Sequence, residues 1–222
     1  YDLTRKYYLF GRDTLLSDMS IPDGARVLEV GCGTGRNLIQ AARANPQALF
    51  YGFDISRAML DTARAKASRS AVGDRTFVTA GDAETFDARK FFGVDGFNRV
   101  FLSYTLSMIP DWECALDNAM DQLQENGSLH IVDFGTMHRW PRGLRKTMLG
   151  WLGKFHVEPR EDLEATARRL ACRRGFGIQI RQLGGGYTVL VDISRSPEVA
   201  AENASKNNHP DSFDKPNPAM QT

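Results

Sequence analysis

The chain lacks several features, and each absence removes a class of protein. Only three cysteines are present, Cys32, Cys114 and Cys172, and no two of them have the CxxC spacing. Their odd number and wide separation argue against a disulfide framework or a zinc site, so no metal is expected. No apolar run approaches the roughly 18 residues that a membrane-spanning helix needs. An excess of one charge is missing as well: 28 Lys and Arg balance 27 Asp and Glu, and a net charge of +1 predicts no nucleic-acid partner.

The remaining composition is that of an ordinary folded domain. Hydrophobic residues make up 42% and charged residues 25% of the 222 positions, and this length can bury a sizeable core. No signal peptide is visible, so we expect a cytoplasmic protein. The first residue is Tyr1 rather than Met, and we therefore expect that a few residues precede it.

Segments of strand length alternate with segments of helical periodicity. Runs rich in β-branched and aromatic residues predict strands at 26–30, 48–54, 76–82, 97–106 and 128–135. Strands joined by helices predict a mostly parallel, doubly wound sheet, which a hairpin within 178–193 completes with an antiparallel last strand. Few large apolar residues follow position 193, so 194–222 is expected to be a flexible tail. The sequence thus predicts a single α/β domain over 1–193.

Three glycines on alternate positions follow the first predicted strand, in LEVGCGTGRN (28–37). At Gly31, Gly33 and Gly35 the bare backbone lets a ligand approach the start of the next helix. The spacing is GxGxG, whereas a dinucleotide fingerprint reads GxGxxG. Arg36 stands where that fingerprint has its third glycine, which disfavours a nicotinamide oxidoreductase.

Acidic residues end the next two predicted strands. Asp54 lies 23 positions after Gly31, where a carboxylate can accept both hydroxyls of a ribose. The motif EVGCGTG resembles motif I of the class I S-adenosylmethionine-dependent methyltransferases, and Asp82-Ala83, at the end of the third predicted strand, resembles that family's adenine-edge position. The resemblance implies a Rossmann-like fold with a seven-stranded sheet, S-adenosylmethionine as the cofactor and S-adenosylhomocysteine as its product. The cofactor-binding residues that it implies are Tyr8, Arg12, Glu29, Gly31, Cys32, Gly33, Gly35, Asn37, Asp54, Ile55, Met59, Asp82, Ala83 and Ser103. Cys32 has no base beside it in the sequence and is expected to fill space.

Three other stretches concern the methyl acceptor: YDLTRKYYLFGRD (1–13), LSYTLSMIPDW (102–112), and VDFG (132–135) with the basic and aromatic segment that follows it. Over about residues 1–193 they closely resemble the bacterial betaine-lipid N-methyltransferases. This implies that the amine of diacylglyceryl-homoserine is methylated three times, with a partner enzyme supplying that lipid. N-methyltransferases of phosphatidylethanolamine or of small amines remain alternatives. A nucleotide-binding module without chemistry is a more distant one, and the oligomeric state is left open.

Tyrosine and histidine supply the candidates for chemistry at the amine. A primary amine must lose a proton, which tyrosine, histidine or a relayed water can take. Aromatic faces also hold a quaternary ammonium product, at about 0.5–2 kcal/mol each. The catalytic candidates are Tyr8, Tyr104 and His138. The substrate-binding candidates are Tyr7, Ser107 and Arg142. By the family resemblance, residues 1–20 form a lid helix over the cofactor and Arg12 meets its carboxylate, although Tyr7 also fits a plain apolar helix stripe.

The segment 137–157 contains no acidic residue and combines basic with aromatic side chains. Its apolar residues recur at the spacing of one helix face: Leu144, Met148, Trp151, Leu152 and Phe155. A basic helix with such a face is typical of a membrane interface, where anionic lipid attracts the charges. The same pattern fits a helix whose apolar face packs on the sheet. With a lipid acceptor the membrane interpretation is favoured, and we expect peripheral association with the inner face of the membrane.

Overall fold

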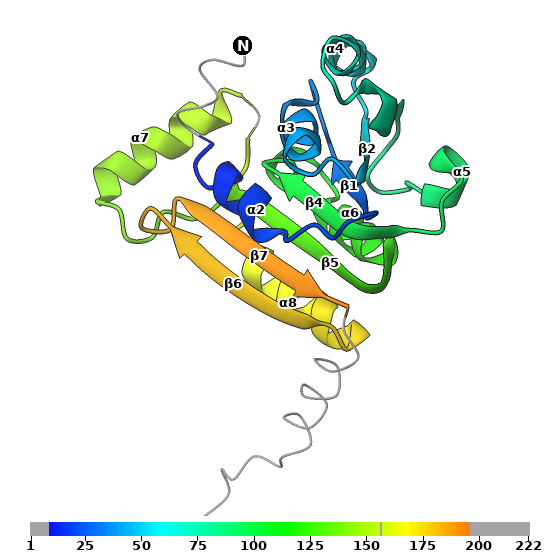
Figure 1. The fold of residues 1–222 in the computed structure, drawn as a ribbon. Coiled ribbons are helices and arrows are strands. Elements are labelled where there is room, and N and C mark those ends of the chain that lie inside the picture. The colour runs from blue at the N-terminus through cyan, green and yellow to red at the C-terminus, as the bar shows by residue number, and fades with distance from the viewer. Residues whose placement is uncertain (1–8, 156, 196–222) are drawn as a thin grey trace, which may run out of the picture.

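The structure is a computed structural model that describes residues 9–155 and 157–195. Seven strands form one sheet in the order β3-β2-β1-β4-β5-β7-β6 (Figure 1). The strands are β1 (Arg26–Val30), β2 (Leu49–Asp54), β3 (Thr76–Ala80), β4 (Phe97–Ser103), β5 (Leu123–Phe134), β6 (Gly177–Leu183) and β7 (Thr188–Ser194). Strands β1 to β5 pair in parallel, and β7 is antiparallel to both of its neighbours. The predicted mostly parallel α/β sheet with an antiparallel last strand is confirmed.

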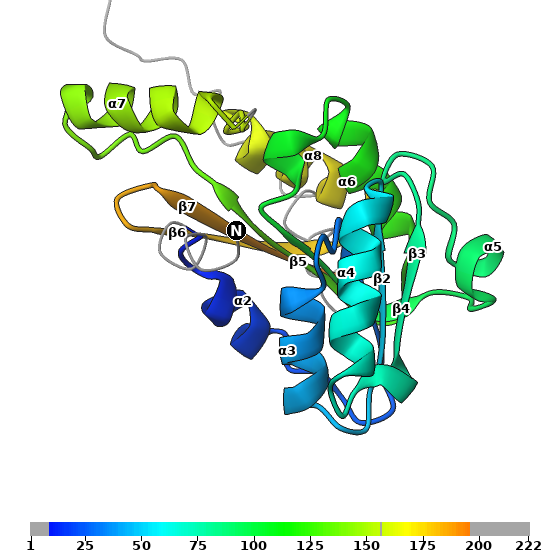
Figure 2. The ribbon, with the colours of Figure 1, turned by 90° about the horizontal axis from the view of Figure 1, so that it is seen from above.

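Helices cover both faces of this sheet. They are α2 (Arg12–Asp18), α3 (Arg36–Ala44), α4 (Arg57–Ser68), α5 (Ala88–Phe92), α6 (Trp112–Asp121), α7 (Arg142–Gly153) and α8 (Leu163–Arg174), with short 3-10 turns η1 (Gly73–Arg75) and η2 (Leu106–Met108). Figure 2 shows α6 and α8 on one side of the sheet and α2 and α3 on the other. Local signals set the ends: Ser56 caps α4 by accepting a hydrogen bond from the Met59 N–H, and Gly175 ends α8 at φ +68°. Among the described residues, no helix has the length and apolar character needed to cross a bilayer.

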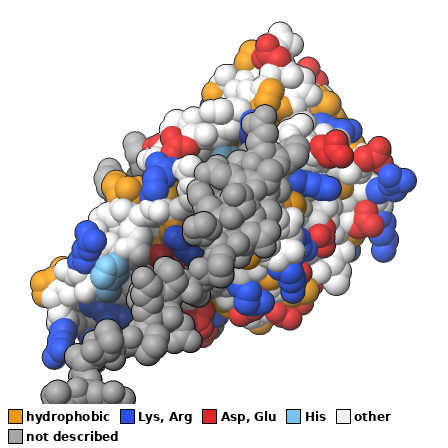
Figure 3. All heavy atoms as spheres, turned by 90° about the horizontal axis from the view of Figure 1, so that it is seen from below, with side chains coloured by type: hydrophobic (Ala, Val, Ile, Leu, Met, Phe, Trp, Pro, Cys, Tyr) orange, Lys and Arg blue, Asp and Glu red, His pale blue; other side chains and the backbone are white. Residues whose placement is uncertain are grey.

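Two apolar clusters, one on each face, hold the layers together. Val100 and Phe101 are adjacent on β4 but belong to opposite clusters, as the alternation of a pleated strand requires. The first cluster includes residues of α6 and α8, and the second includes residues of α2 and α3. On the face drawn in Figure 3, acidic and basic side chains are interspersed, in keeping with the nearly balanced charge.

Several expected boundaries differ from the structure: the third strand ends at Ala80 rather than at 82, and the fifth begins at Leu123 rather than at 128. The fourth strand, predicted over 97–106, ends at Ser103 because Tyr104 adopts a left-handed backbone conformation with φ +56°. Of the lid helix predicted over 1–20, the described part contains α2, while residues 1–8 lie outside the described residues. The predicted tail begins at residue 194, but Ser194 is the last residue of β7, and from residue 196 onward the tail lies outside the described residues.

A polar cluster links α2 to the last two strands. The His130 Nδ1 lies 2.7 Å from the Asp192 Oδ1, and its Nε2 lies 2.8 Å from the Ser128 Oγ. Arg181 donates to Asp192 at 3.2 Å and to Asp18, at the end of α2, at 2.6 Å. These bonds tie α2 to β6 and β7 at a distance from the site described next.

Candidate active site

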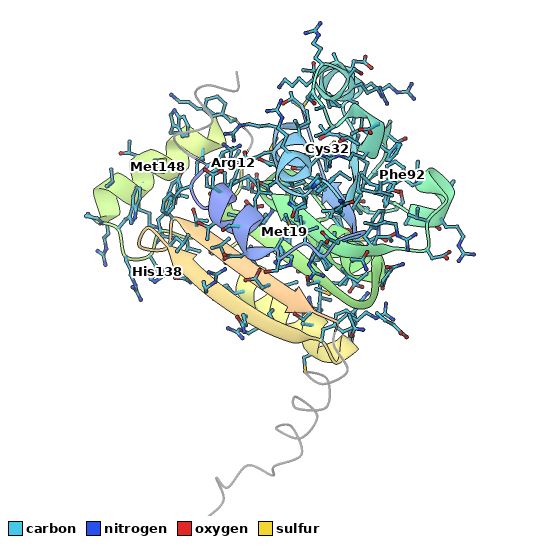
Figure 4. The ribbon with its side chains drawn as sticks, viewed as in Figure 1. Arg12, Met19, Cys32, Phe92, His138 and Met148 are labelled. Atoms are coloured by element: carbon cyan, nitrogen blue, oxygen red, sulfur yellow. The ribbon has the colours of Figure 1, made fainter. Side chains whose placement is uncertain are left out.

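A cavity of about 460 Å³ opens at the carboxyl ends of β1 and β4. These two strands flank the point where the strand order reverses, which is where open α/β sheets bind their ligands. The predicted cofactor-binding residues that line it are Arg12, Glu29, Gly31, Cys32, Gly33, Asn37 and Ser103. Figure 4 shows Arg12 and Cys32 at this edge of the sheet. Segments distant in the sequence, from α2, the glycine loop, β4 and α7, thus meet around one space.

The three glycine positions of the loop differ in what a side chain there would contact. All have positive φ, at 68°, 53° and 72° for Gly31, Gly33 and Gly35. A Cβ on Gly31 would lie 2.4 Å from the Cγ2 of Thr105. A Cβ on Gly35 would lie 3.0 Å from the Cβ of Ala63. A Cβ on Gly33 would meet no atom closer than 3.7 Å, and Gly33 lines the cavity. Close approach within the chain therefore explains two of the glycines, and Gly33 leaves the backbone open to a ligand.

The Asp54 carboxylate is held beside the loop by two backbone groups. Its Oδ2 accepts from the Gly33 N–H and its Oδ1 from the Ser56 N–H, both at 2.8 Å. A carboxylate has about four acceptor positions, so about two stay available for ligand hydroxyls. Ile55, next in the chain, is 79% exposed and adds apolar surface there. Asp54 therefore stands as a pre-oriented acceptor, in the position predicted for a ribose.

The residues predicted for the adenine edge lie one strand further out. The Asp82 Oδ1 accepts from the Glu84 N–H at 2.9 Å, and the Ala83 carbonyl oxygen accepts from the Asn118 side chain at 2.9 Å. Both lie beyond the end of β3, outside the lining of the cavity. Their contact with adenine stays a prediction.

Glu29 is an ionisable group buried in the cavity wall. It is 2% exposed, and burial is the main cause that raises its pKa to about 8, while a hydrogen bond from Asn37 at 3.0 Å works in the opposite direction. Burial also raises the pKa of the Cys32 thiol, with the carboxylates of Glu29 and Asp54 adding to the effect. A thiol in this setting stays protonated and fills space.

Several buried polar atoms along this wall have no hydrogen-bond partner within the described residues, among them the Glu29 Oε2, the Asn37 Oδ1, the Ser103 Oγ and one terminal nitrogen of Arg36. Buried polar atoms are nearly always paired, so a cluster of unpaired ones indicates where a ligand or water completes the bonds. The three oxygens suit an ammonium group, and the guanidinium suits a carboxylate. The set therefore fits the amino-acid portion of S-adenosylmethionine.

Tyr104 borders the cavity, but its hydroxyl is engaged elsewhere. The hydroxyl donates to the Phe10 carbonyl oxygen and lies 3.0 Å from the Thr188 Oγ1. The side chain is buried, and burial raises the pKa of this phenol above its ordinary value. These contacts disfavour the predicted role of Tyr104 as the group that takes the proton of the amine.

Three other candidates do not line the cavity. Ser107 is 1% exposed, and its N–H donates to the Asp133 Oδ2 at 3.1 Å. Arg142 is exposed at the start of α7, and Figure 4 shows His138 beside the β6–β7 hairpin, apart from Arg12. The structure therefore does not bring these three together with the cofactor residues. Tyr7 and Tyr8 lie outside the described residues.

The sequence reasoning missed the apolar mouth of the cavity. Met108, Trp151 and Phe155 line it and are 51%, 36% and 56% exposed. The Trp151 and Phe155 rings meet edge to face, with centroids 5.0 Å apart. Leu152, also on α7, is 1% exposed and packs in the core. The apolar face predicted for the segment 137–157 therefore has two environments: Leu152 packs on the core, and Trp151 and Phe155 surround the opening of the cavity. Its aromatic residues were a usable signal for the cavity.

Comparisons with known proteins agree with this geometry. A family model described as "Methyltransferase domain" matches residues 21–162. Aklanonic acid methyltransferase DauC of Streptomyces sp. (strain C5) is 36% identical over 118 residues, which cover 51% of this chain and 50% of that protein. The chain spans about half or less of the length of the curated relatives it matches.

Two solved structures show the same fold. An O-methyltransferase family protein from Burkholderia thailandensis superposes with a TM-score of 0.68 at 18% identity, covering 88% of this chain and 59% of that one. Magnesium protoporphyrin IX methyltransferase from Synechocystis PCC 6803, solved with bound S-adenosylhomocysteine, gives 0.61 at 22% identity, covering 87% and 84%.

Proposed function

The chain belongs to the methyltransferase domain family, and on that premise we propose that it methylates the amine of a membrane lipid, diacylglyceryl-homoserine, with S-adenosylmethionine as the methyl donor. The observation that carries the acceptor is the apolar mouth of the cofactor cavity. It is formed by the exposed side chains of Met108, Trp151 and Phe155. Acyl chains match this mouth, because large exposed apolar groups mark a surface that contacts something apolar.

Charge on α7 supports an acceptor that resides in a membrane. Arg142 and Lys146 are exposed on this helix, and Trp151 near its end lines the cavity mouth together with Phe155, which follows the helix. Basic residues near an anionic surface contribute about 1 kcal/mol each. Arg145 is less available, since it lies 3.7 Å from Glu161. A helix with this arrangement can bring the cavity mouth to the lipid, at the inner face of the membrane.

Different residues of the chain would bind different parts of the cofactor during the reaction. When bound, S-adenosylmethionine supplies a methyl group on a sulfonium, activated for displacement. Asp54 and Gly33 would hold its ribose side, and Glu29 and Arg36 its amino-acid portion. In-line displacement depends mainly on aligning the amine nitrogen, the methyl carbon and the sulfur, and residues that hold the cofactor and the acceptor in fixed positions provide this alignment. Among the described candidates, the Tyr104 hydroxyl is engaged with Phe10 and His138 does not line the cavity, so we assign the proton of the amine to water.

Product identity tests the acceptor. The protein is incubated with labelled S-adenosylmethionine and vesicles that contain diacylglyceryl-homoserine. Parallel reactions contain phosphatidylethanolamine vesicles or free homoserine, and the products are identified by mass spectrometry. We expect the mono-, di- and trimethylated forms of diacylglyceryl-homoserine. Methylation of phosphatidylethanolamine or of free homoserine instead would replace the proposed acceptor with one of those two.

Two neighbouring residues of α7 give a matched test of membrane contact. Trp151→Ala removes a partly exposed ring, so binding to anionic vesicles should weaken while the melting temperature changes little. Leu152→Ala removes a fully buried side chain and should cost about 2–5 kcal/mol of stability. Arg142→Gln with Lys146→Gln should also weaken vesicle binding, and added salt should reduce the difference. If the Trp151→Ala protein is destabilised but binds vesicles as before, α7 does not contact the bilayer.

A further inference from the structure

Three groups from distant parts of the chain meet beside the cavity. The Tyr104 hydroxyl, at the end of β4, donates to the carbonyl oxygen of Phe10. The Thr188 hydroxyl, at the start of β7, lies 3.0 Å from the Tyr104 oxygen and donates to the same carbonyl at 3.2 Å. One carbonyl of the N-terminal segment is therefore held by two side chains from the sheet.

The bonded carbonyl lies inside a segment that forms part of the cavity wall. Leu9 and Arg12, on either side of it, both line the cavity. Gly11 has φ +89°, and a Cβ there would lie 3.1 Å from the Thr188 Cγ2, so the segment already runs close against β7. Moving Phe10 away from the sheet would move Leu9 and Arg12 with it.

The direction of the Tyr104 side chain is imposed by its surroundings. Its backbone is left-handed at φ +56°, a conformation that costs energy for a bulky residue and persists only where the structure requires it. Its ring packs against Phe134, with centroids 4.5 Å apart. Together these constraints aim the hydroxyl at Phe10.

We propose that Tyr104 is a positioning residue whose hydroxyl, with that of Thr188, holds residues 9–12 in place as a wall of the cofactor cavity. The inference rests on the proposed function through its cofactor alone, and the identity of the acceptor does not enter. Without the hydroxyl, a smaller fraction of molecules has the wall in place, and the apparent dissociation constant rises by the inverse of that fraction. Turnover at saturating cofactor and acceptor should change much less.

The test measures S-adenosylhomocysteine binding by calorimetry for the wild type, Tyr104→Phe, Thr188→Val and Thr188→Ser. We expect the dissociation constant to rise about three- to tenfold in Tyr104→Phe and Thr188→Val, as the loss of one hydrogen bond predicts. Thr188→Ser keeps the hydroxyl and should bind as the wild type does. Hydrogen exchange at residues 9–12 should speed up in the two weakened variants and return to normal in Thr188→Ser.

Other results would overturn the inference in recognisable ways. A Tyr104→Phe protein with a lower melting temperature but unchanged affinity and exchange would reduce the contact to a structural one. A loss of kcat with unchanged affinity would return Tyr104 to a catalytic role. A wild-type protein that fails to bind S-adenosylhomocysteine would refute the proposed cofactor site itself, which separates that failure from this one.

Discussion

Replacing Glu29 with Gln should make the cofactor-free protein more stable above neutral pH and weaken cofactor binding. Burial raises the pKa of Glu29 from 4.5 to about 8, although the hydrogen bond from Asn37 and the nearby charge of Arg12 act to lower it. Its Oε1 accepts from Asn37 at 3.0 Å, which a glutamine carbonyl can also do. The substitution therefore removes the titration and keeps the shape.

The sign follows from proton linkage. Between pH 4.5 and about 8 the folded protein holds a proton on Glu29 that the unfolded chain has released. The free energy of unfolding must then fall as pH rises, by at most about 1.4 kcal/mol per pH unit. With relaxation around the ion, we expect Glu29 to cost the empty protein about 2–4 kcal/mol by pH 9. A bound ammonium group would offset this cost, so the instability belongs to the empty site.

The assay is urea unfolding of the cofactor-free protein at pH 6 and at pH 9, with S-adenosylhomocysteine calorimetry under the same conditions. Between the two pH values the free energy of unfolding of Glu29→Gln should fall by about 1–2 kcal/mol less than that of the wild type, and the variant should bind the ligand about 1–3 kcal/mol more weakly. Glu125→Gln, at an exposed position of β5, is the control and should behave as the wild type does. An identical pH dependence in wild type and Glu29→Gln would refute the reasoning.

Three further outcomes can be measured on single variants. Asp54→Asn should weaken S-adenosylhomocysteine binding by about 1–3 kcal/mol in calorimetry, because ribose hydroxyls lose a charged acceptor; unchanged affinity would put the ribose elsewhere. Gly33→Ala should abolish most binding while the fold survives, whereas Gly31→Ala should lower the melting temperature, since its Cβ would lie 2.4 Å from a threonine methyl carbon. Burial favours a higher pKa for Asp192, but the hydrogen bond from His130 holds that pKa below its ordinary value, so its stabilising effect should be present near neutral pH and disappear in acid. Asp192→Asn should therefore cost about 1–3 kcal/mol at pH 6 and less at pH 2, by urea unfolding; a constant difference would contradict this.

Much of the fold could be predicted because its signals are local. Strand runs separated by helical periodicity indicate a parallel sheet, and GxGxG directly after a strand places the first turn at its carboxyl edge. The place of Asp54 beside that turn could be predicted, since the end of the neighbouring strand must lie there, while its contact with a ribose stays a prediction. Such inferences need only short-range pattern and the rules of α/β topology.

The direction of side chains around the cavity could not be predicted in the same way. The Tyr104 hydroxyl bonds to a carbonyl 94 positions earlier, and a left-handed backbone at a tyrosine has no sequence signature. Helical spacing on α7 shows that one face is apolar, but it does not say that Leu152 packs inward while Trp151 borders an opening. The glycine pattern likewise does not reveal that Gly31 and Gly35 are required by contacts within the chain.

The insertion of β7 between β5 and β6 has a consequence for the order in which the molecule matures. Strand β6 precedes β7 in the chain, but among the described strands it pairs with β7 alone. Thr188, the first residue of β7, also supplies one of the two hydroxyls that hold Phe10. A growing chain that has not yet reached β7 thus lacks the edge of the sheet formed by β6 and β7. It also lacks the hydrogen bond from Thr188 to Phe10 in the cavity wall. We therefore expect a chain cut short before Thr188 to lack a complete cofactor site.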